Sequence, residues 1–214
     1  MSEPVSLLHP TTPPRLRLDF YNTAVLLSRW EADGRQIAHP VSVHDVVSAC
    51  THVPINSRLL PKNTLFWKQQ GSETTLGIFV PGRRWQVQTE ARRYEVPMPP
   101  FVFVGRALDY SIFAVKKRPV TGREPLFHVP CPNVHSHGTI CPGNTPFPFC
   151  SAQTILGALT LFMEDSLFNS HLCQHKCRTY PEDVRQLWAE MDGRKRFLLS
   201  ELIPLQRSLH ALLS

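Results

Sequence analysis

Proline is the residue that most constrains what this chain can fold into. The 214 residues include 20 prolines, and many of them fall in two stretches, Pro97–Pro100 and Pro130–Pro148. Proline fixes φ and has no backbone N–H, so neither stretch can lie inside a helix, and both limit the freedom of the unfolded chain. We therefore expect long loops of fixed conformation between the apolar segments, above all over the second stretch.

The composition is that of a folded protein outside the membrane. Hydrophobic residues make up 42% of the chain and charged residues 19%, which is typical of a globular protein with a core. No run reaches the roughly 18 apolar residues of a membrane span, and the first 20 residues lack a basic region followed by an apolar one. We therefore expect a cytoplasmic protein that does not enter a membrane. Its six cysteines are then expected to be reduced thiols.

The formal net charge of +6 is spread over short basic clusters. Pairs and triplets of this kind usually lie at solvated turns and helix ends. The sequence shows neither a recognition helix nor an aromatic platform among basic residues, so we do not expect nucleic-acid binding. The clusters are Arg83–Arg84, Arg92–Arg93, Lys116–Arg118 and Arg194–Arg196.

Strand patterns fill the first half of the chain. Residues 15–41 alternate apolar and polar around the turn pair Asp33–Gly34, which indicates a hairpin. Ser42 then has Asp45 three positions later, the pattern of an N-cap that opens a short helix. Short β-branched and aromatic segments separated by turn residues, one of them at Gly71, follow over residues 61–117, and these predict an antiparallel meander.

Helical spacing dominates after the proline-rich stretch, so we expect an α+β fold. Helices are predicted from Ser151, from Pro181, and over residues 194–213 with a break near Pro204. We expect one compact domain. Its predicted parts are a loose leader (1–14), an N-terminal hairpin with a short helix (15–60), a core (61–180) that contains the loop 131–150, and C-terminal helices (181–214).

The stretch CPNVHSHGTIC, Cys131–Cys141, concentrates nucleophilic and polar side chains in front of a predicted helix. A cysteine is a good nucleophile because about a few per cent of it is thiolate at neutral pH. Exchange of one thioester for another needs no built-in base, but a side-chain amide can stabilise the oxyanion of the intermediate. Asn133 precedes Cys141 by eight residues, and the loop between them could fold back to bring the two together.

These residues resemble the signature of the ubiquitin-conjugating enzymes. Pro132 and Asn133 stand at that family's Pro-Asn positions, and Gly138, Ile140 and Cys141 stand at its Gly-x-Ile-Cys positions. Phe149 takes the place of a tryptophan before the helix, and MPPFVFV resembles the family's Pro-Pro-x-Val strand. The strong match covers about residues 97–168. More narrowly, the chain is similar to the B proteins of the bacterial PRTRC cassette of mobile elements, which includes a ThiF-related activating enzyme.

The resemblance implies a ubiquitin-conjugating (UBC-like) fold, with an antiparallel meander packed against helices and an extra N-terminal hairpin and short helix. It implies that Cys141 carries a ubiquitin-like modifier as a thioester and that Asn133 stabilises the oxyanion. The partners would be a ThiF-like activating enzyme, the modifier and an acceptor protein that the sequence does not identify. The protein itself would need no metal or organic cofactor.

Four features depart from the family pattern. The family's leading histidine is Cys131 here, and an additional segment surrounds residues 109–125. Residues 169–177 contain no Asp or Glu to serve as the acidic residue near the incoming lysine, and only Ser170 or His171 could replace it. The N-terminal helix that docks the activating enzyme in the family is not obvious. Transfer between thiols is therefore better supported than transfer to lysine.

Several alternatives remain open from the sequence alone. Cys141 could be a small buried hydrophobe, and the protein could be a non-catalytic scaffold that binds a ubiquitin-like protein. A zinc site is a further alternative, although no Cys-x-x-Cys pair occurs. HLCQHKC (171–177) could equally be a surface turn between helices. A cysteine protease is disfavoured because nothing near Cys141 offers a triad. The candidate zinc ligands are Cys131, His135, His137, Cys141, Cys150, His171, Cys173, His175 and Cys177.

Overall fold

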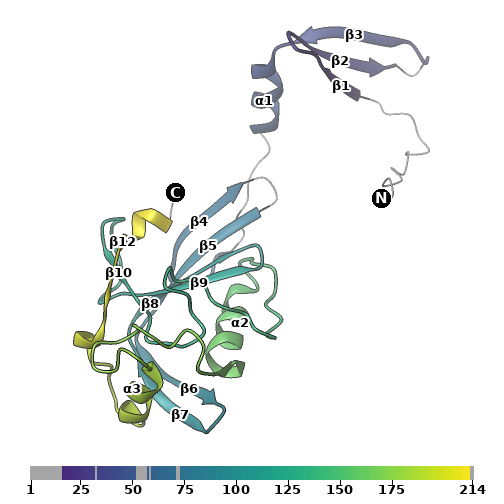
Figure 1. The fold of residues 1–214 in the computed structure, drawn as a ribbon. Helices are drawn as coiled ribbons and strands as arrows, with labels where there is room; N and C mark the ends of the chain where they lie inside the picture. The colour runs from purple at the N-terminus through teal and green to yellow at the C-terminus, as the bar shows by residue number, and fades with distance from the viewer. Residues whose placement is uncertain (1–15, 32, 52–56, 58, 71–72, 213–214) are drawn as a thin grey trace. The chain divides into compact units, whose positions relative to one another are not determined.

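The computed structural model contains two compact units, Met1–Asn56 and Ser57–Ser214 (Figure 1). The expected leader (1–14), the turn at Gly71 and the side chain of Cys50 lie outside the described residues. The finer division of the chain at residues 60 and 180 stays a prediction. The structure describes residues 16–31, 33–51, 57, 59–70 and 73–212.

The N-terminal unit is a three-stranded antiparallel sheet followed by one helix, where the sequence predicts a hairpin and a helix. Its strands lie in the order β1-β2-β3. The helix begins as expected at Ser42, whose Oγ accepts the Asp45 N–H (3.0 Å) while the Asp45 carboxylate accepts the Ser42 N–H (3.3 Å). This reciprocal capping satisfies two N–H groups at the helix start. The elements are β1 (Leu16–Phe20), β2 (Val25–Trp30), β3 (Gln36–Val41) and α1 (Val43–Thr51).

Two sheets form the β part of the second unit. The larger has the order β12-β10-β9-β8-β5-β4 and is antiparallel throughout, and the smaller has the order β11-β6-β7 with β11 parallel to β6. Their strands are β4 (Thr64–Gln70), β5 (Glu73–Val80), β6 (Arg83–Thr89), β7 (Arg93–Met98), β8 (Phe101–Arg106), β9 (Asp109–Ala114), β10 (Pro125–Phe127), β11 (Leu167–Phe168) and β12 (Pro204–Ser208).

The expected meander is therefore interrupted. The β6–β7 hairpin leaves the large sheet, and β8 returns to pair with β5. Pro81 precedes this hairpin and Pro99–Pro100 follow it. Because proline cannot donate to a ladder of backbone hydrogen bonds, the pairing of the large sheet stops at both places.

The prolines inside strands occupy positions that tolerate them. Pro40 lies in β3 and Pro97 in β7, and both are edge strands. Pro125 and Pro204 are the first residues of β10 and β12. A missing N–H is harmless at an edge or at a strand start. The stretch Pro130–Pro148 contains no helix and no extended strand, as its composition predicts.

Helices follow the proline-rich stretch but begin later than expected. Around Ser151 the hydroxyl accepts the N–H groups of Gln153 and Thr154, which holds a turn in front of the helix. Such local bonds compete with helix formation. The helix continues into a turn of π-helix. The elements are α2 (Ile155–Thr160), the π-helical η1 (Leu161–Asp165) and α3 (Val184–Met191), the last capped by Asp183.

The predicted helix over residues 194–213 is wrong. This segment forms two 3₁₀ turns, η2 (Leu199–Glu201) and η3 (Leu209–Leu212), on either side of β12. Pro204 has no N–H for a helix, but it can begin the edge strand β12, which pairs with β10. Leu205 of this strand is buried in the apolar cluster that also contains Val104 and Phe113.

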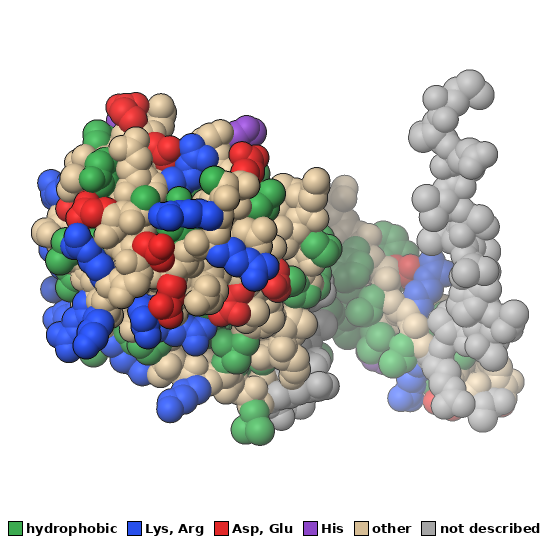
Figure 2. Space-filling view, turned by 90° about the horizontal axis from the view of Figure 1, so that it is seen from below, with side chains coloured by type: hydrophobic (Ala, Val, Ile, Leu, Met, Phe, Trp, Pro, Cys, Tyr) green, Lys and Arg blue, Asp and Glu red, His purple; other side chains and the backbone are tan. Residues whose placement is uncertain are grey.

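Apolar side chains cover both faces of the large sheet. One face packs Leu76, Ile78 and Phe103 against α2 and α3 in the main core. The other face carries a smaller cluster in which Phe113 and Val104 meet residues of β12 and η3. No helix among the described residues is long and apolar enough to cross a membrane. Basic and acidic side chains are interspersed on the surface that Figure 2 shows.

Candidate active site

Residues 133–141 fold into a tight hairpin that brings the two predicted site residues opposite one another. The Cys141 N–H donates to the carbonyl of Asn133 (2.8 Å), and the His135 N–H donates to the carbonyl of Thr139 (2.8 Å). The turn closes with a hydrogen bond from the Gly138 N–H to the His135 carbonyl (2.9 Å). Asn133 and Cys141 therefore stand at the base of the hairpin; we name residues 133–141 the Cys141 hairpin.

The Cys141 hairpin is attached to strand β9. The Ile140 N–H donates to the Tyr110 carbonyl (2.8 Å), and the Ile112 N–H donates to the Gly138 carbonyl (2.9 Å). Gly138 has φ of 97°, and a Cβ at this position would collide with the ring of Phe113. Glycine is needed here both for the left-handed backbone and for the close approach to the sheet.

Asn133 is fixed by residues that follow α2. Its backbone N–H donates to the His171 carbonyl (3.1 Å), and its side-chain amide donates to the Leu167 carbonyl (3.2 Å). Its φ of 59° lies in the left-handed region, which asparagine tolerates better than most residues. The base of the Cys141 hairpin thus rests on the segment that contains β11 and the turn after it.

Cys131, at the position of the family's histidine, is part of the core. Its side chain is fully buried, and burial raises the pKa of its thiol. The neighbouring Pro130 carbonyl accepts a hydrogen bond from the buried indole Nε1 of Trp188 (2.8 Å), which anchors the loop to α3. Cys131 fills space and stays a neutral thiol.

Cys141 differs from the other cysteines that the structure describes. It is partly exposed, whereas Cys131, Cys150, Cys173 and Cys177 are buried. Burial raises the pKa of each of these four thiols, and that of Cys150 reaches about 11. Within the described residues, Cys141 is therefore the one cysteine that is not buried.

The Cys and His side chains do not form a metal site in the described part of the chain. No group of three or more His, Cys, Asp or Glu side chains there is placed to hold an ion. The rings of His135 and His137 stack on one another, with centroids 5.3 Å apart. The thiols of Cys173 and Cys177 instead donate to the carbonyls of Ser170 (2.7 Å) and Tyr180 (3.2 Å).

HLCQHKC is not a simple surface turn. Cys173, Lys176 and Cys177 are buried, and Leu172 and His175 have positive φ values of 56° and 57°. Positive φ in residues other than glycine is strained and is held only where the surroundings fix it. The segment is packed against the core beside the Cys141 hairpin.

Lys176 is a feature of the site that sequence reasoning missed. Only 3% of its surface is exposed, and its Nζ donates to the His135 carbonyl (3.3 Å). Burial lowers the pKa of its ammonium to about 8. It lines a polar cavity of about 570 Å³ together with Val134, Ser136 and Cys173. A lysine between polar residues is ordinarily exposed, so no sequence signal marks this one.

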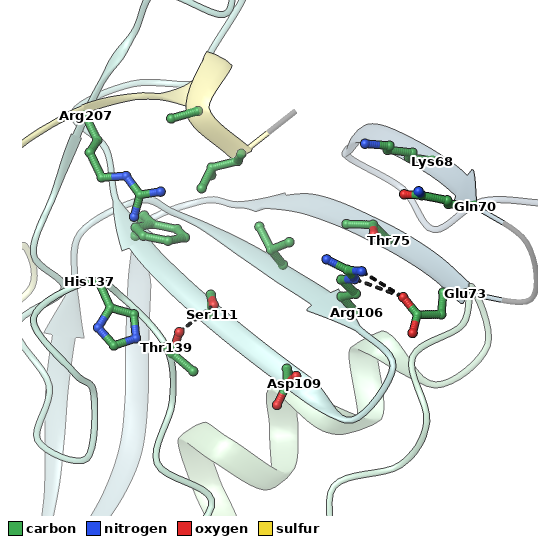
Figure 3. A pocket seen from close by; sticks show the side chains of 14 residues that line it. Lys68, Gln70, Glu73, Thr75, Arg106, Asp109, Ser111, His137, Thr139 and Arg207 are labelled. Carbon is green, nitrogen blue, oxygen red and sulfur yellow. Dashed lines mark hydrogen bonds and ion pairs between the residues drawn. The ribbon is translucent and has the colours of Figure 1, made fainter. Parts of the chain in front are cut away.

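A second polar groove, of about 390 Å³, runs from the Cys141 hairpin over the sheet face that carries Phe113 (Figure 3). At one end, the Arg207 side chain points toward His137. Nearby, the hydroxyls of Ser111 and Thr139 lie 3.4 Å apart. At the other end, an ion pair joins Arg106 and Glu73 (2.9 Å). Cys141 is not among the residues that line this groove.

Residues 42–205 match the family described as Prokaryotic E2 family D, which covers well over half of the chain. The chain belongs to prokaryotic E2 family D. The ubiquitin-conjugating resemblance of the Cys131–Cys141 stretch is thereby confirmed at the level of a prokaryotic E2, and the mixed α and β structure is compatible with an E2-like fold. The narrower likeness to the PRTRC proteins stays a prediction. Neither a curated protein nor a solved structure matches the chain.

The family match includes α1 and the Cys141 hairpin and ends at the second residue of β12, whereas β1, β2 and β3 precede it. E2 proteins as a class work with an activating enzyme and a modifier protein. Membership of the family therefore implies partners of these two general kinds. The E2 family also indicates a transferase of the ubiquitin-conjugating type.

Proposed function

We propose that this E2 protein accepts the C-terminus of a ubiquitin-like modifier as a thioester on Cys141, from a ThiF-like activating enzyme. The observation that carries the proposal is the exposure of Cys141, since the other four described cysteines are buried. A modifier arrives attached to a partner protein, so only a thiol at the surface can receive it. The PRTRC resemblance supports the choice of a ThiF-like partner.

The reaction is an exchange of thioesters. The Cys141 thiolate attacks the carbonyl carbon of the thioester that joins the modifier to the activating enzyme. A tetrahedral oxyanion forms, the carbon–sulfur bond to the activating enzyme breaks, and that enzyme's thiolate leaves and takes up the proton that Cys141 gave to solvent. One thioester is consumed and one is formed, so no cofactor is required on this chain. ATP is used only by the activating partner.

Asn133 is proposed to stabilise the oxyanion. An amide nitrogen has two N–H groups, and the hydrogen bond to the Leu167 carbonyl takes one of them. The backbone bond between Cys141 and Asn133 keeps the two residues paired across the hairpin base. Donors held in place before the reaction are the effective ones, because they need no reorganisation as charge develops.

The thioester then passes to an amine or to another acceptor, which remains to be identified. The segment 169–177 has no carboxylate that could take a proton from an incoming lysine. His171 is exposed and its carbonyl contacts Asn133, so this histidine and Ser170 stay the candidates for that role. Transfer to a thiol makes a smaller demand on the site than transfer to lysine, because it needs no group that takes a proton from an ammonium.

A thioester assay tests the proposal. The protein is mixed with the activating enzyme, ATP and small candidate modifiers encoded near it, and the products are separated on non-reducing gels. We expect an adduct that reductant removes, its loss in Cys141→Ala, and its retention in Cys131→Ala. Cys141→Ser should give an ester that resists reductant.

Two results would contradict this function. Equal loss of adduct in Cys141→Ala and Cys131→Ala would indicate that the two cysteines act together, as in a shared metal site. Absence of any adduct, with the activating enzyme active in pyrophosphate exchange, would favour a scaffold that binds the modifier without reacting.

A further inference from the structure

Lys176 is a buried cation that forms no ion pair within the described residues, although Glu182 and Asp183 line the same cavity. Its side chain is 3% exposed, and no ion pair joins it to an Asp or Glu among the residues that the structure describes. The nearby groups that interact with its charge are the thiols of Cys131 and Cys173 and the imidazole of His128. Burying a charge without an opposite charge costs free energy of folding. A purely structural role would be served better by an apolar residue.

Among the described residues, the one hydrogen bond that its ammonium donates goes to the Cys141 hairpin. Nζ lies 3.3 Å from the His135 carbonyl, which also accepts the Gly138 N–H that closes the turn. The His135 N–H in turn bonds to Thr139, two residues before Cys141. Lys176 therefore binds the middle of the hairpin, at the His135–Thr139 pair. This pair lies between the turn of the hairpin and the Asn133–Cys141 pair at its open end.

Lys176 belongs to the same segment that holds Asn133. The Leu167 and His171 carbonyls bind the Asn133 amide and backbone N–H, and Lys176 binds His135. Three bonds thus join residues 167–176 to the first arm of the Cys141 hairpin. The other arm is held by β9. The hairpin is thus held from both sides, and among the described residues Lys176 is the one side chain of the segment 167–176 that forms a hydrogen bond with it.

We infer that Lys176 is a positioning residue, which fixes the Cys141 hairpin in the geometry needed for thioester transfer and does not itself contact the reacting atoms. The expected effect of Lys176 on the rate of thioester transfer rests on the proposed function. The structural part of the inference, the immobilisation of the hairpin, stands on the hydrogen bond and the burial alone. A small misplacement of a reacting group is enough to slow a reaction about 100-fold.

The test compares Lys176→Met with the native protein. Methionine matches the lysine side chain as far as Cε but has neither the charge nor the N–H donors. Three quantities are measured: the hydrogen-exchange rates of the amides in residues 133–141, the thermal unfolding midpoint, and the single-turnover rate of thioester formation. Lys117→Met is the matched control, because it makes the same chemical change at an exposed lysine.

We expect Lys176→Met to keep or raise the unfolding midpoint, to speed exchange in the hairpin while strands β5 and β8 stay protected, and to slow thioester formation roughly 10- to 100-fold. Lys117→Met should match the native protein in all three. Native exchange and a native rate in Lys176→Met would overturn the inference. A fall in midpoint with loss of protection throughout the unit would overturn it too, because Lys176 would then support the fold as a whole.

A second variant covers the case in which Lys176→Met does not fold. Lys176→Gln retains an N–H donor without the charge, and we expect exchange and rate between those of the native and a donor-free side chain. Native exchange in Lys176→Gln, or loss of protection throughout the unit, would overturn the inference. Failure of the proposed function has a different signature: the native protein forms no thioester, while hydrogen exchange still reports whether Lys176 holds the hairpin.

Discussion

The buried indole of Trp188 donates a hydrogen bond to the carbonyl of Pro130, 2.8 Å away, at the point where the chain leaves the sheet for the Cys141 hairpin. The partners lie 58 positions apart in the sequence. The bond ties α3 to the first residue of the proline-rich stretch. The nearby prolines have no backbone N–H to offer the Pro130 carbonyl, and the indole N–H of Trp188 serves as its donor instead.

Trp188→Phe should lower the free energy of unfolding by about 1–3 kcal/mol more than Trp85→Phe. Both indoles are buried, with 1% and 2% exposure. The first substitution leaves the Pro130 carbonyl without this donor, whereas Nε1 of Trp85 has no partner among the described residues. Urea unfolding followed by circular dichroism gives both values. Equal losses would show that the Trp188 bond contributes nothing beyond ring packing.

Gly138→Ala should lower the free energy of unfolding by about 2–4 kcal/mol, from a φ of 97° and from the collision of the new Cβ with Phe113. Gly143 is the matched control. Its φ is also positive, at 53°, but an added Cβ would meet no atom within 4 Å. Gly143→Ala should therefore cost only about 1–2 kcal/mol. The same cost in both variants would mean that the hairpin can move away from β9.

Among the described cysteines, iodoacetamide should alkylate Cys141 first when the protein is native. The other four thiols are buried, and the pKa of about 11 at Cys150 leaves roughly one part in a thousand of it as thiolate at pH 8. Peptide mapping by mass spectrometry after short exposures measures the order. Alkylation of Cys131 as fast as Cys141 would show that the loop opens readily.

Native stability should rise with pH between about 8 and 10.5, relative to Lys176→Met. The folded pKa of Lys176, about 8, lies below its ordinary value of 10.5. In that window the unfolded chain binds more protons than the folded one, so the free energy of unfolding increases with pH. Between the two ends of this pH window, the free energy of unfolding of the native protein should rise by about 3 kcal/mol relative to that of Lys176→Met. Comparison with the variant removes the opposite contribution of the buried cysteines. A flat difference would mean that Lys176 titrates normally.

Sequence reasoning succeeded where local signals determine the structure. The Ser42–Asp45 pair begins α1 because both partners of the cap lie within one turn. It also placed Asn133 and Cys141 as neighbours, since a short loop with Gly138 can fold back on itself.

It failed where distant partners decide the outcome. Residues 197–202 have apolar side chains at helical spacing. The helix does not form, because the chain that follows them pairs as β12 with β10. Lys176 gives no local sign of burial, because its place depends on a hydrogen bond to a carbonyl 41 positions earlier in the chain.

The π-helical turn η1 lies between α2 and the strand that holds Asn133. Each residue of an α-helix advances the chain about 100° around the helix axis, and a π-helical turn inserts an additional residue into this rotation. The insertion therefore affects the direction in which the chain leaves the helix before β11, where the Leu167 carbonyl accepts the hydrogen bond of the Asn133 amide. Loss of a single residue from 161–165 would turn that carbonyl away without altering any residue of the Cys141 hairpin. The orientation of Asn133, the proposed oxyanion donor, thus depends on the length of the helix that precedes β11.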